Sequence, residues 1–229
     1  MKLTKEEIQD LYTFTRKHFV EHYDLQTELV DHLANDIEQM WREQPKLGFE
    51  DARDKAFKKF GVFGFMDAIE QKQKALRKKY TKILFQHAKE WFKLPKILTT
   101  IMIFLFFYIS IQNAIGIYFF SVAIIGLVIV EFYYAFKLKK TANQRFKTNG
   151  RKWMLEEMIF NVAAMGNILI CSNLPNFFNH ILKDSATQLQ ALFVALLLTL
   201  TIIYSYITLM VLPAKADELL SEQYPEFSL

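Results

Sequence analysis

The chain has 229 residues, a formal net charge of +4, and 52% hydrophobic and 15% aromatic residues. This composition is too apolar for a disordered protein, and a single cysteine excludes a disulfide scaffold. The charges are unevenly distributed. Glu131 is the one charged residue between Ile97 and Phe136, and only four lie between Trp153 and Leu212. The sequence therefore predicts an all-α protein, in which a small cytosolic helical bundle is followed by a four-helix transmembrane domain.

Residues 1–75 show the signals of a small bundle of helices. Thr4 and Glu7 have the spacing of a capping box, which begins a helix whose apolar residues recur at helical spacing. A second helix is expected from about 24 to 44, and a third, shorter one over roughly 50–60. With the start of a fourth helix they are long enough to enclose one small core. We therefore predict a cytosolic helical interaction domain over 1–75.

The fourth helix is expected to run to about Lys93, and Pro95 marks either a break or a kink before the next apolar run. Residues 76–96 are basic, with aromatic and aliphatic side chains interleaved. This pattern is typical of a juxtamembrane helix that lies against anionic lipid headgroups. Because a nearby bilayer already explains the basic charge, we predict the lipid bilayer as a partner and no nucleic acid.

Four apolar runs follow. A hydrocarbon core of about 30 Å needs roughly 20 residues of helix, which each run approaches or reaches. The third is the weakest, because Asn161, Gly166 and Asn167 interrupt it. We include it so that the basic loop before it and the tail, residues 214–229, lie on the same side. The expected transmembrane domain, 97–213, consists of two antiparallel hairpins with spans at about 94–112, 117–136, 154–174 and 189–212.

The distribution of Lys and Arg predicts the orientation of these spans. The loop 137–152 holds seven Lys and Arg residues, and the stretch before the first span is also basic. The first hairpin loop holds none, and the loop between the third and fourth spans holds only Lys183. Positively charged short loops stay in the cytoplasm. We therefore expect both the N-terminus and the C-terminus to be cytoplasmic.

Three short motifs of the N-terminal half form a known pattern: an acidic E-L-x-x-H-L helix within Tyr23–Leu33, a helix start at Gly48–Ala52, and a closing Phe60-Gly61. They resemble the HAAS-type helical domain, which is similar to the permease-prefix domain of bacterial membrane proteins. The resemblance covers about 20–75; Phe49 departs from it, because the family usually carries Ser or Thr there. It implies a bacterial cytoplasmic (inner) membrane protein with a small interaction module for signalling or regulation, and it implies no reaction.

Acidic and imidazole side chains recur along the second helix, where Glu28, Asp31 and His32 are the candidate partner-binding residues. Such side chains at this spacing can hold zinc or a di-iron centre if a second helix supplies matching ligands. The third helix offers only acidic residues near its start. We therefore interpret His32 as a histidine at the edge of the core, and we predict no metal and no cofactor.

The apolar half contains a few polar residues of interest. Ionisable groups within membrane spans are costly and are usually functional or paired. Glu131 is interpreted either as an interface carboxylate that pairs with Lys137 or Lys152, or as a transport residue. Asn161 and Asn167 are expected to form hydrogen bonds between helices. The candidate lining of one polar pocket is Glu131, Asn161, Asn167, Tyr204 and Tyr206.

No phosphate-binding loop, dinucleotide fingerprint, HExxH motif or GxSxG motif is found, so the sequence predicts no catalytic residue and no enzyme. We expect a membrane-anchored regulator or adaptor that binds an unknown protein partner. One alternative is a small transporter or channel subunit that uses Glu131, Asn161 and Asn167, for which assembly into a homo-oligomer would help. A further alternative is an intramembrane lipid-modifying enzyme, for which the sequence assembles no set of acid, base or metal ligands.

Overall fold

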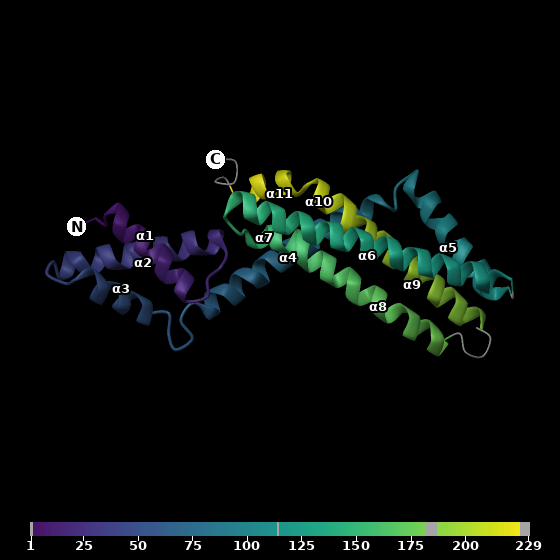
Figure 1. Ribbon diagram of the computed structural model, residues 1–229, viewed down its shortest axis with the longest axis horizontal. Helices are drawn as coiled ribbons and strands as arrows, with labels where there is room; N and C mark the ends of the chain where they lie inside the picture. The colour runs from purple at the N-terminus through teal and green to yellow at the C-terminus, as the bar shows by residue number, and fades with distance from the viewer. Residues whose placement is uncertain (1, 114, 182–186, 225–229) are drawn as a thin grey trace. The chain divides into compact units, whose positions relative to one another are not determined.

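The computed structural model describes residues 2–113, 115–181 and 187–224, apart from the side chains of 117, 149, 162, 171 and 174–181. These residues form helices and turns, with no strand among them (Figure 1), which confirms the predicted all-α class. The chain divides into two compact units. The first comprises residues 1–79 and 149–155, and the second comprises residues 80–148 and 156–229.

The first unit is built on three helices and the start of a fourth: α1 (Lys5–Lys17), α2 (Tyr23–Glu43), α3 (Phe49–Lys58) and α4 (Met66–Glu90). The expected capping box begins α1, because the Thr4 hydroxyl accepts the Glu7 N–H at 3.2 Å and the Glu7 carboxylate accepts the Thr4 N–H at 2.8 Å. Helix α2 packs on both α1 and α3. The core that they enclose includes Leu11, Leu25, Leu29, Leu33, Ile37, Ala52, Ala56 and Phe65.

The turn between α3 and α4 depends on two glycines. Gly61 and Gly64 have φ angles of +81° and +55°, which side chains other than hydrogen rarely allow. A Cβ atom on Gly64 would lie 2.8 Å from Cζ of Phe57. This close approach lets Phe65 enter the core, where its ring centre lies 4.8 Å from that of Phe57. The turn thereby places the start of α4 against the bundle.

A short segment from much later in the chain completes the first unit. The backbone N–H of Tyr23 donates to the Lys152 carbonyl at 2.7 Å, and the Tyr23 ring meets the Trp153 ring edge-on with centres 5.3 Å apart. Trp153 is 4% exposed. Residues 149–155 therefore pack with the N-terminal helices, although the sequence grouped them with the apolar half.

The second unit contains the rest of α4 and the remaining helices. Helices α5 and α9 pack on each other, and π-helical segments, η1 and η2, interrupt the two long C-terminal helices. A buried cluster of Phe, Ile, Leu, Val and Ala side chains joins α5, α6 and α9. The elements are α5 (Lys96–Gln112), α6 (Gly116–Asn149), α7 (Met154–Glu157), η1 (Met158–Val162), α8 (Ala163–Ile181), α9 (Gln188–Tyr206), η2 (Ile207–Val211), α10 (Leu212–Ala214) and α11 (Ala216–Gln223).

Two helical stretches of the described chain, Tyr118–Thr148 and Gln188–Ala214, are long and apolar enough to cross a membrane. Helix α5 is apolar but has 17 residues. The chain breaks between α4 and α5, as expected near Pro95. The prediction of a loop over 137–152 is wrong for most of this stretch, because α6 continues to Asn149. Residues 137–149 contain four lysines together with Leu138, Ala142, Gln144 and Arg145, which favour helix, and no glycine occurs before Gly150.

The C-terminal parts of the prediction differ in detail from the structure. The helix that begins at Met154 continues to Ile181, beyond the expected end of the third span at 174. The expected tail 214–229 contains helix α11. Residues 182–186 of the expected outer loop and residues 225–229 of the tail lie outside the described residues.

Candidate functional site

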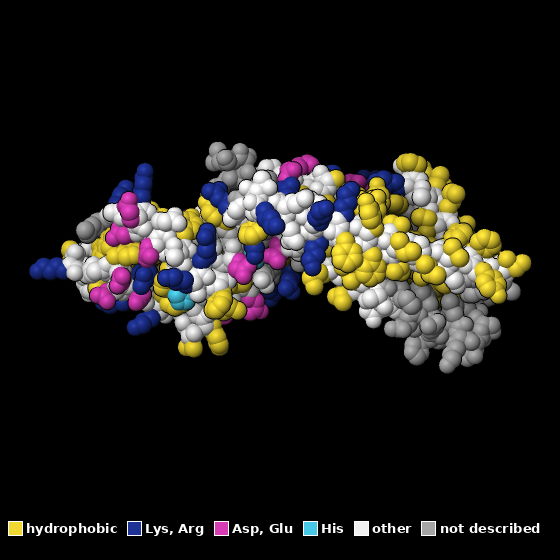
Figure 2. All heavy atoms as spheres, in the orientation of Figure 1, with side chains coloured by type: hydrophobic (Ala, Val, Ile, Leu, Met, Phe, Trp, Pro, Cys, Tyr) yellow, Lys and Arg dark blue, Asp and Glu magenta, His cyan; other side chains and the backbone are white. Residues whose placement is uncertain are grey.

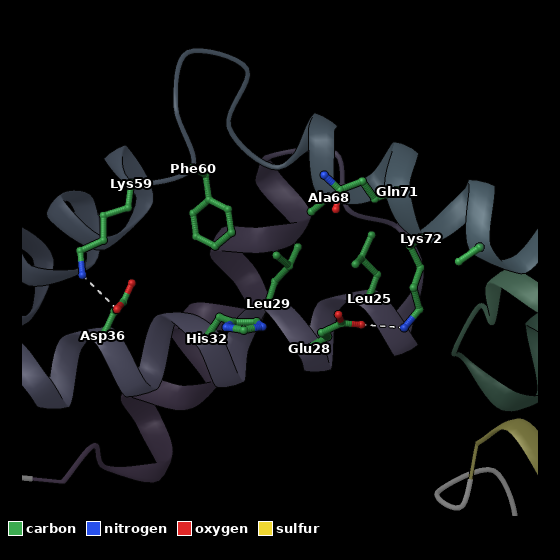
Figure 3. A pocket seen from close by; sticks show the side chains of 11 residues that line it. Leu25, Glu28, Leu29, His32, Asp36, Lys59, Phe60, Ala68, Gln71 and Lys72 are labelled. Carbon is green, nitrogen blue, oxygen red and sulfur yellow. Dashed lines mark hydrogen bonds and ion pairs between the residues drawn. The ribbon is translucent and has the colours of Figure 1, made fainter.

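A groove of about 460 Å³ lies in the first unit, between α2, the end of α3 and the first turns of α4 (Figure 3). Its floor is apolar. Leu25 and Leu29 of α2 are each 2% exposed, and Phe60 closes the floor from the end of α3. Small side chains on α4, Ala68 and Ala75, leave the space open. The accessible apolar surface of the groove therefore comes from Phe60, Ala68 and Ala75, whereas the two leucines lie almost fully covered beneath it.

Two ion pairs connect the walls of this groove (Figure 3). Glu28 of α2 pairs with Lys72 of α4 at 2.6 Å, and Asp36 of α2 pairs with Lys59 at 2.9 Å. His32 lies between the two carboxylates along α2, because residues four apart share a helix face. The four charged side chains are 25–54% exposed, so each pair contributes at most about 1 kcal/mol to stability. A ligand with its own charges can replace these pairs at little cost.

The structure brings together two of the three predicted partner-binding residues. Glu28 and His32 line the groove, whereas Asp31 does not. Asp31 lies on the face of α2 that is near Tyr12: burial raises the pKa of the Tyr12 phenol, and the negative charge of Asp31 adds to this increase. Sequence reasoning missed the roles of Lys59 and Lys72, because no local pattern links these lysines to α2.

The described residues contain no group of three or more His, Cys, Asp or Glu side chains that could hold a metal ion. In the groove, Glu28 and Asp36 face lysines, and His32 lies about one helical turn from each. The arrangement suits a peptide with apolar and charged side chains, which would lie on the apolar floor and contact the charged rim.

A second cavity, of about 260 Å³, lies in the second unit between α6 and the α9–η2 helix. Glu131 lines it and is 5% exposed. The five side chains predicted to share one pocket do not share it: Glu131 and Tyr206 line this cavity, and the other three do not. Tyr204 lines a separate apolar hollow, and Asn161 lies in η1, outside both cavities.

Asn167 has a different role, because it joins two helices. Its side-chain amide donates to the Ala163 carbonyl and to Oγ1 of Thr208, each at 2.8 Å. Both Asn167 and Thr208 are fully buried. The expected hydrogen bond between helices is thus present for Asn167, and it connects α8 to the π-helical segment η2.

The two lysines predicted as alternative partners of Glu131 make other contacts. Lys152 pairs with Glu21 at 2.7 Å, in the first unit. The Lys137 ammonium lies 6.0 Å from the ring centre of Tyr134, which lines the Glu131 cavity. Glu131 itself is a buried wall residue of the cavity in the second unit.

The two cavities differ in the groups that they present to a ligand. Among the described residues that line them, no serine or cysteine lies beside a histidine, so neither cavity contains an activated nucleophile. The groove presents an apolar floor with a charged rim, and the Glu131 cavity presents one carboxylate among apolar and aromatic side chains.

In comparisons with protein-family models, curated proteins and solved structures, nothing matches this chain.

Proposed function

We propose that this chain is an integral inner-membrane protein of regulatory or adaptor type, whose first unit binds a segment of a partner protein in the α2–α4 groove. The observation that carries the proposal is the open groove, with apolar surface from Phe60, Ala68 and Ala75, between two replaceable ion pairs. The resemblance of Tyr23–Leu33 to the HAAS-type helical domain supports the same function, since Glu28 and His32 of that motif line the groove.

Four membrane crossings are part of this proposal: α5, α6, the α7–η1–α8 helix and the α9–η2–α10 helix. Large apolar side chains of α5, α6 and α9 are exposed, and Figure 2 shows them gathered over these helices. Soluble proteins rarely expose contiguous apolar patches of this kind, which supports a lipid environment. At 1.5 Å per residue, α5 extends about 25 Å, which is near the lower limit for a span.

The groove favours a partner segment with both apolar and charged side chains. Apolar side chains of the partner would cover Phe60, Ala68 and Ala75, at about 25 cal/mol for each Å² removed from water. Charged side chains of the partner would replace one or both rim ion pairs. Binding would then depend on Glu28 and Lys72 more than on charges elsewhere on α2.

Site-specific photo-crosslinking in intact membranes tests this function. A photoreactive phenylalanine at Gln71, in the groove wall, should give one discrete crosslinked partner. The same residue at Asp31, which is exposed on α2 but outside the groove, should not. Equal crosslinking at both positions, or none at Gln71, would contradict the proposal.

A matched pair of charge reversals gives an independent test. Glu28→Lys places two lysines together in the groove wall, whereas Asp31→Lys makes the same charge change three residues away. Crosslinking from Gln71 should fall at least about fivefold in the first variant and be unchanged in the second. A similar loss in both variants would indicate a general charge effect on the unit.

A second candidate function, a small transporter or channel subunit, is favoured by the burial of Glu131 beside a cavity. It predicts solute flux through liposomes that contain the protein, and this flux should fall when Glu131 is changed to Gln. Asn167 is a weaker candidate for this role, because its amide already joins α8 to η2.

A further inference from the structure

We propose that the Glu131 cavity binds the head of an alkylammonium amphiphile, a molecule with one positively charged amine and one apolar chain, that enters from the bilayer. The inference rests on the proposed membrane location of α6 and α9, and it does not depend on the groove of the first unit. The cavity presents the Glu131 carboxyl group among largely apolar side chains.

Two buried polar groups line this cavity. Glu131 and Ser205 are each 5% exposed, and they come from α6 and α9. Ser205 Oγ has no hydrogen-bond partner within the described part of the chain. A buried hydroxyl without a partner is costly, and an ammonium N–H donated to Ser205 would remove that cost. The Glu131 carboxylate lines the same cavity, and its attraction for an ammonium group is stronger where water is excluded.

Aromatic rings complete the wall for a cation. Tyr134 and Tyr206 both line the cavity, and the Trp91 ring meets Tyr206 edge-on with centres 5.3 Å apart. The Lys137 ammonium already lies 6.0 Å from the Tyr134 ring centre, which is a cation–π distance. These rings are therefore placed to interact with positive charge next to Glu131.

The charges of the lining select a ligand with a single positive charge. No Lys or Arg is among the described residues that line the cavity, so a phosphate group inside it would meet the negative charge of Glu131 and no lining cation. An alkylammonium ion brings one positive charge, which interacts with the Glu131 carboxylate. A zwitterionic phospholipid would also bring a negatively charged phosphate. The volume of about 260 Å³ lies just below the range of drug-sized ligand sites, so it suits a head with the start of a chain.

The position of the cavity favours entry from the side. Val130 and Tyr206 line it and are 52% and 43% exposed, among other exposed apolar side chains of α6 and α9. In the proposed membrane this surface faces lipid. An amphiphile dissolved in the bilayer would therefore reach Glu131 between these two side chains, with its chain remaining along Leu127 and Ile202.

The test uses the full chain in nanodiscs of phosphatidylcholine and phosphatidylglycerol, with tritium-labelled decylamine as the probe. We expect saturable binding that unlabelled decylamine displaces, whereas decanol and decanoate do not. Glu131→Gln should weaken binding at least about tenfold, as expected for a lost charged hydrogen bond. Glu218→Gln is the matched control, because it makes the same charge change on the exposed face of α11 and should leave binding unchanged.

Two further variants test decylamine binding in this cavity if Glu131→Gln does not fold. Ser205→Ala should weaken decylamine binding about threefold, and Val130→Trp should block entry and abolish it. Unchanged binding in these variants, or equal displacement by decanol, would overturn the inference. Equal displacement by phosphatidylethanolamine would also overturn it, because the lining would then not select a single charge. A chain that inserts into nanodiscs but binds no decylamine refutes this inference alone, whereas a chain that does not insert refutes the proposed membrane location as well.

Discussion

The Asp24 carboxylate accepts a hydrogen bond from the backbone N–H of Met154, 3.3 Å away and 130 residues further along the chain. Met154 is the first residue of α7, so its N–H is one that a helix leaves without a partner in its own backbone. An acidic group at a helix N-terminus also interacts favourably with the helix dipole. Helix α2 thus supplies a cap for a helix that begins in the second half of the chain.

Removal of this cap should loosen the segment around Met154. We expect Asp24→Ala to lower the free energy of unfolding of the first unit by about 1–3 kcal/mol, because a buried N–H loses its acceptor. Hydrogen exchange of the Met154 amide in the full-length protein measures the effect directly. Asp31→Ala, on the exposed face of the same helix, should leave exchange at Met154 unchanged; equal exchange in the two variants would contradict the capping role.

The segment 149–155 should stabilise the first unit even when the rest of the chain is absent. We expect a fragment of residues 1–79 joined by a flexible linker to 149–155 to melt at a higher temperature than 1–79 alone. Burial of Trp153 against Tyr23 should contribute about 2 kcal/mol. The same fusion with Trp153→Ser is the control, and circular dichroism measures the melting. Identical melting of all three fragments would show that the segment adds no stability.

The Asn167–Thr208 hydrogen bond should appear as a coupling energy between α8 and η2. In a double-mutant cycle of Asn167→Ala and Thr208→Val, we expect about 0.6 kcal/mol of coupling and no more than about 1.7 kcal/mol, if the proposed membrane location of these helices holds. Unfolding in bicelles measures it. Thr201→Val is the matched control, because the Thr201 hydroxyl donates to the Leu197 carbonyl of its own helix. Coupling of Asn167 to Thr201 would refute this assignment.

Arg145 should matter for stability mainly because of one of its two carboxylate partners. Its guanidinium contacts Glu156 at 2.5 Å and Asp217 at 2.6 Å, with side-chain exposures of 10% and 75% for the two acids. We expect Arg145→Ala to cost about 3 kcal/mol, because it leaves the buried Glu156 carboxylate without this cation. Asp217→Asn should cost less than about 1 kcal/mol, because that carboxylate is exposed. Thermal unfolding in detergent measures both.

The double variant Arg145→Ala with Glu156→Gln checks the cause of this loss. Neutralising Glu156 removes the charge that Arg145 balanced, so part of the lost stability should return. If the double variant is as unstable as Arg145→Ala, the contribution of Arg145 comes from its packing over Phe160, where its guanidinium lies 5.3 Å from the ring centre.

Local signals predicted the helices well where the residues involved are neighbours in sequence. The capping box at Thr4 and the break near Pro95 depend on contacts within a few residues, and both are present. The extension of α6 to Asn149 was not predicted. Lys and Arg indicate which side of a membrane a segment occupies, but they are also good helix formers. A basic loop and a basic helix therefore have the same charge pattern in the sequence.

The candidate sites also combine residues that sequence spacing predicted together with residues that only tertiary packing brings together. Glu28 and His32 were predicted together because four residues separate them on one helix, and they line one groove. Lys72 joins them only through tertiary packing, which no spacing reveals. Asn167 and Glu131 were grouped because both are polar residues in apolar runs, yet Asn167 donates to Thr208 and only Glu131 lines the cavity. Polarity within an apolar run selected both residues from the sequence, but their separate positions depend on the packing of the helices.

The packing of residues 149–155 with the N-terminal helices also has a consequence while the chain is being synthesised. A ribosome completes α1, α2 and α3 well before it reaches Trp153, and N-terminal regions begin to fold during translation. Throughout that interval the Tyr23 ring lacks the indole that later covers it, and the Asp24 carboxylate lacks the Met154 amide. The nascent chain therefore presents a surface that the finished protein conceals, and a chaperone that recognises this surface would distinguish unfinished chains from complete ones.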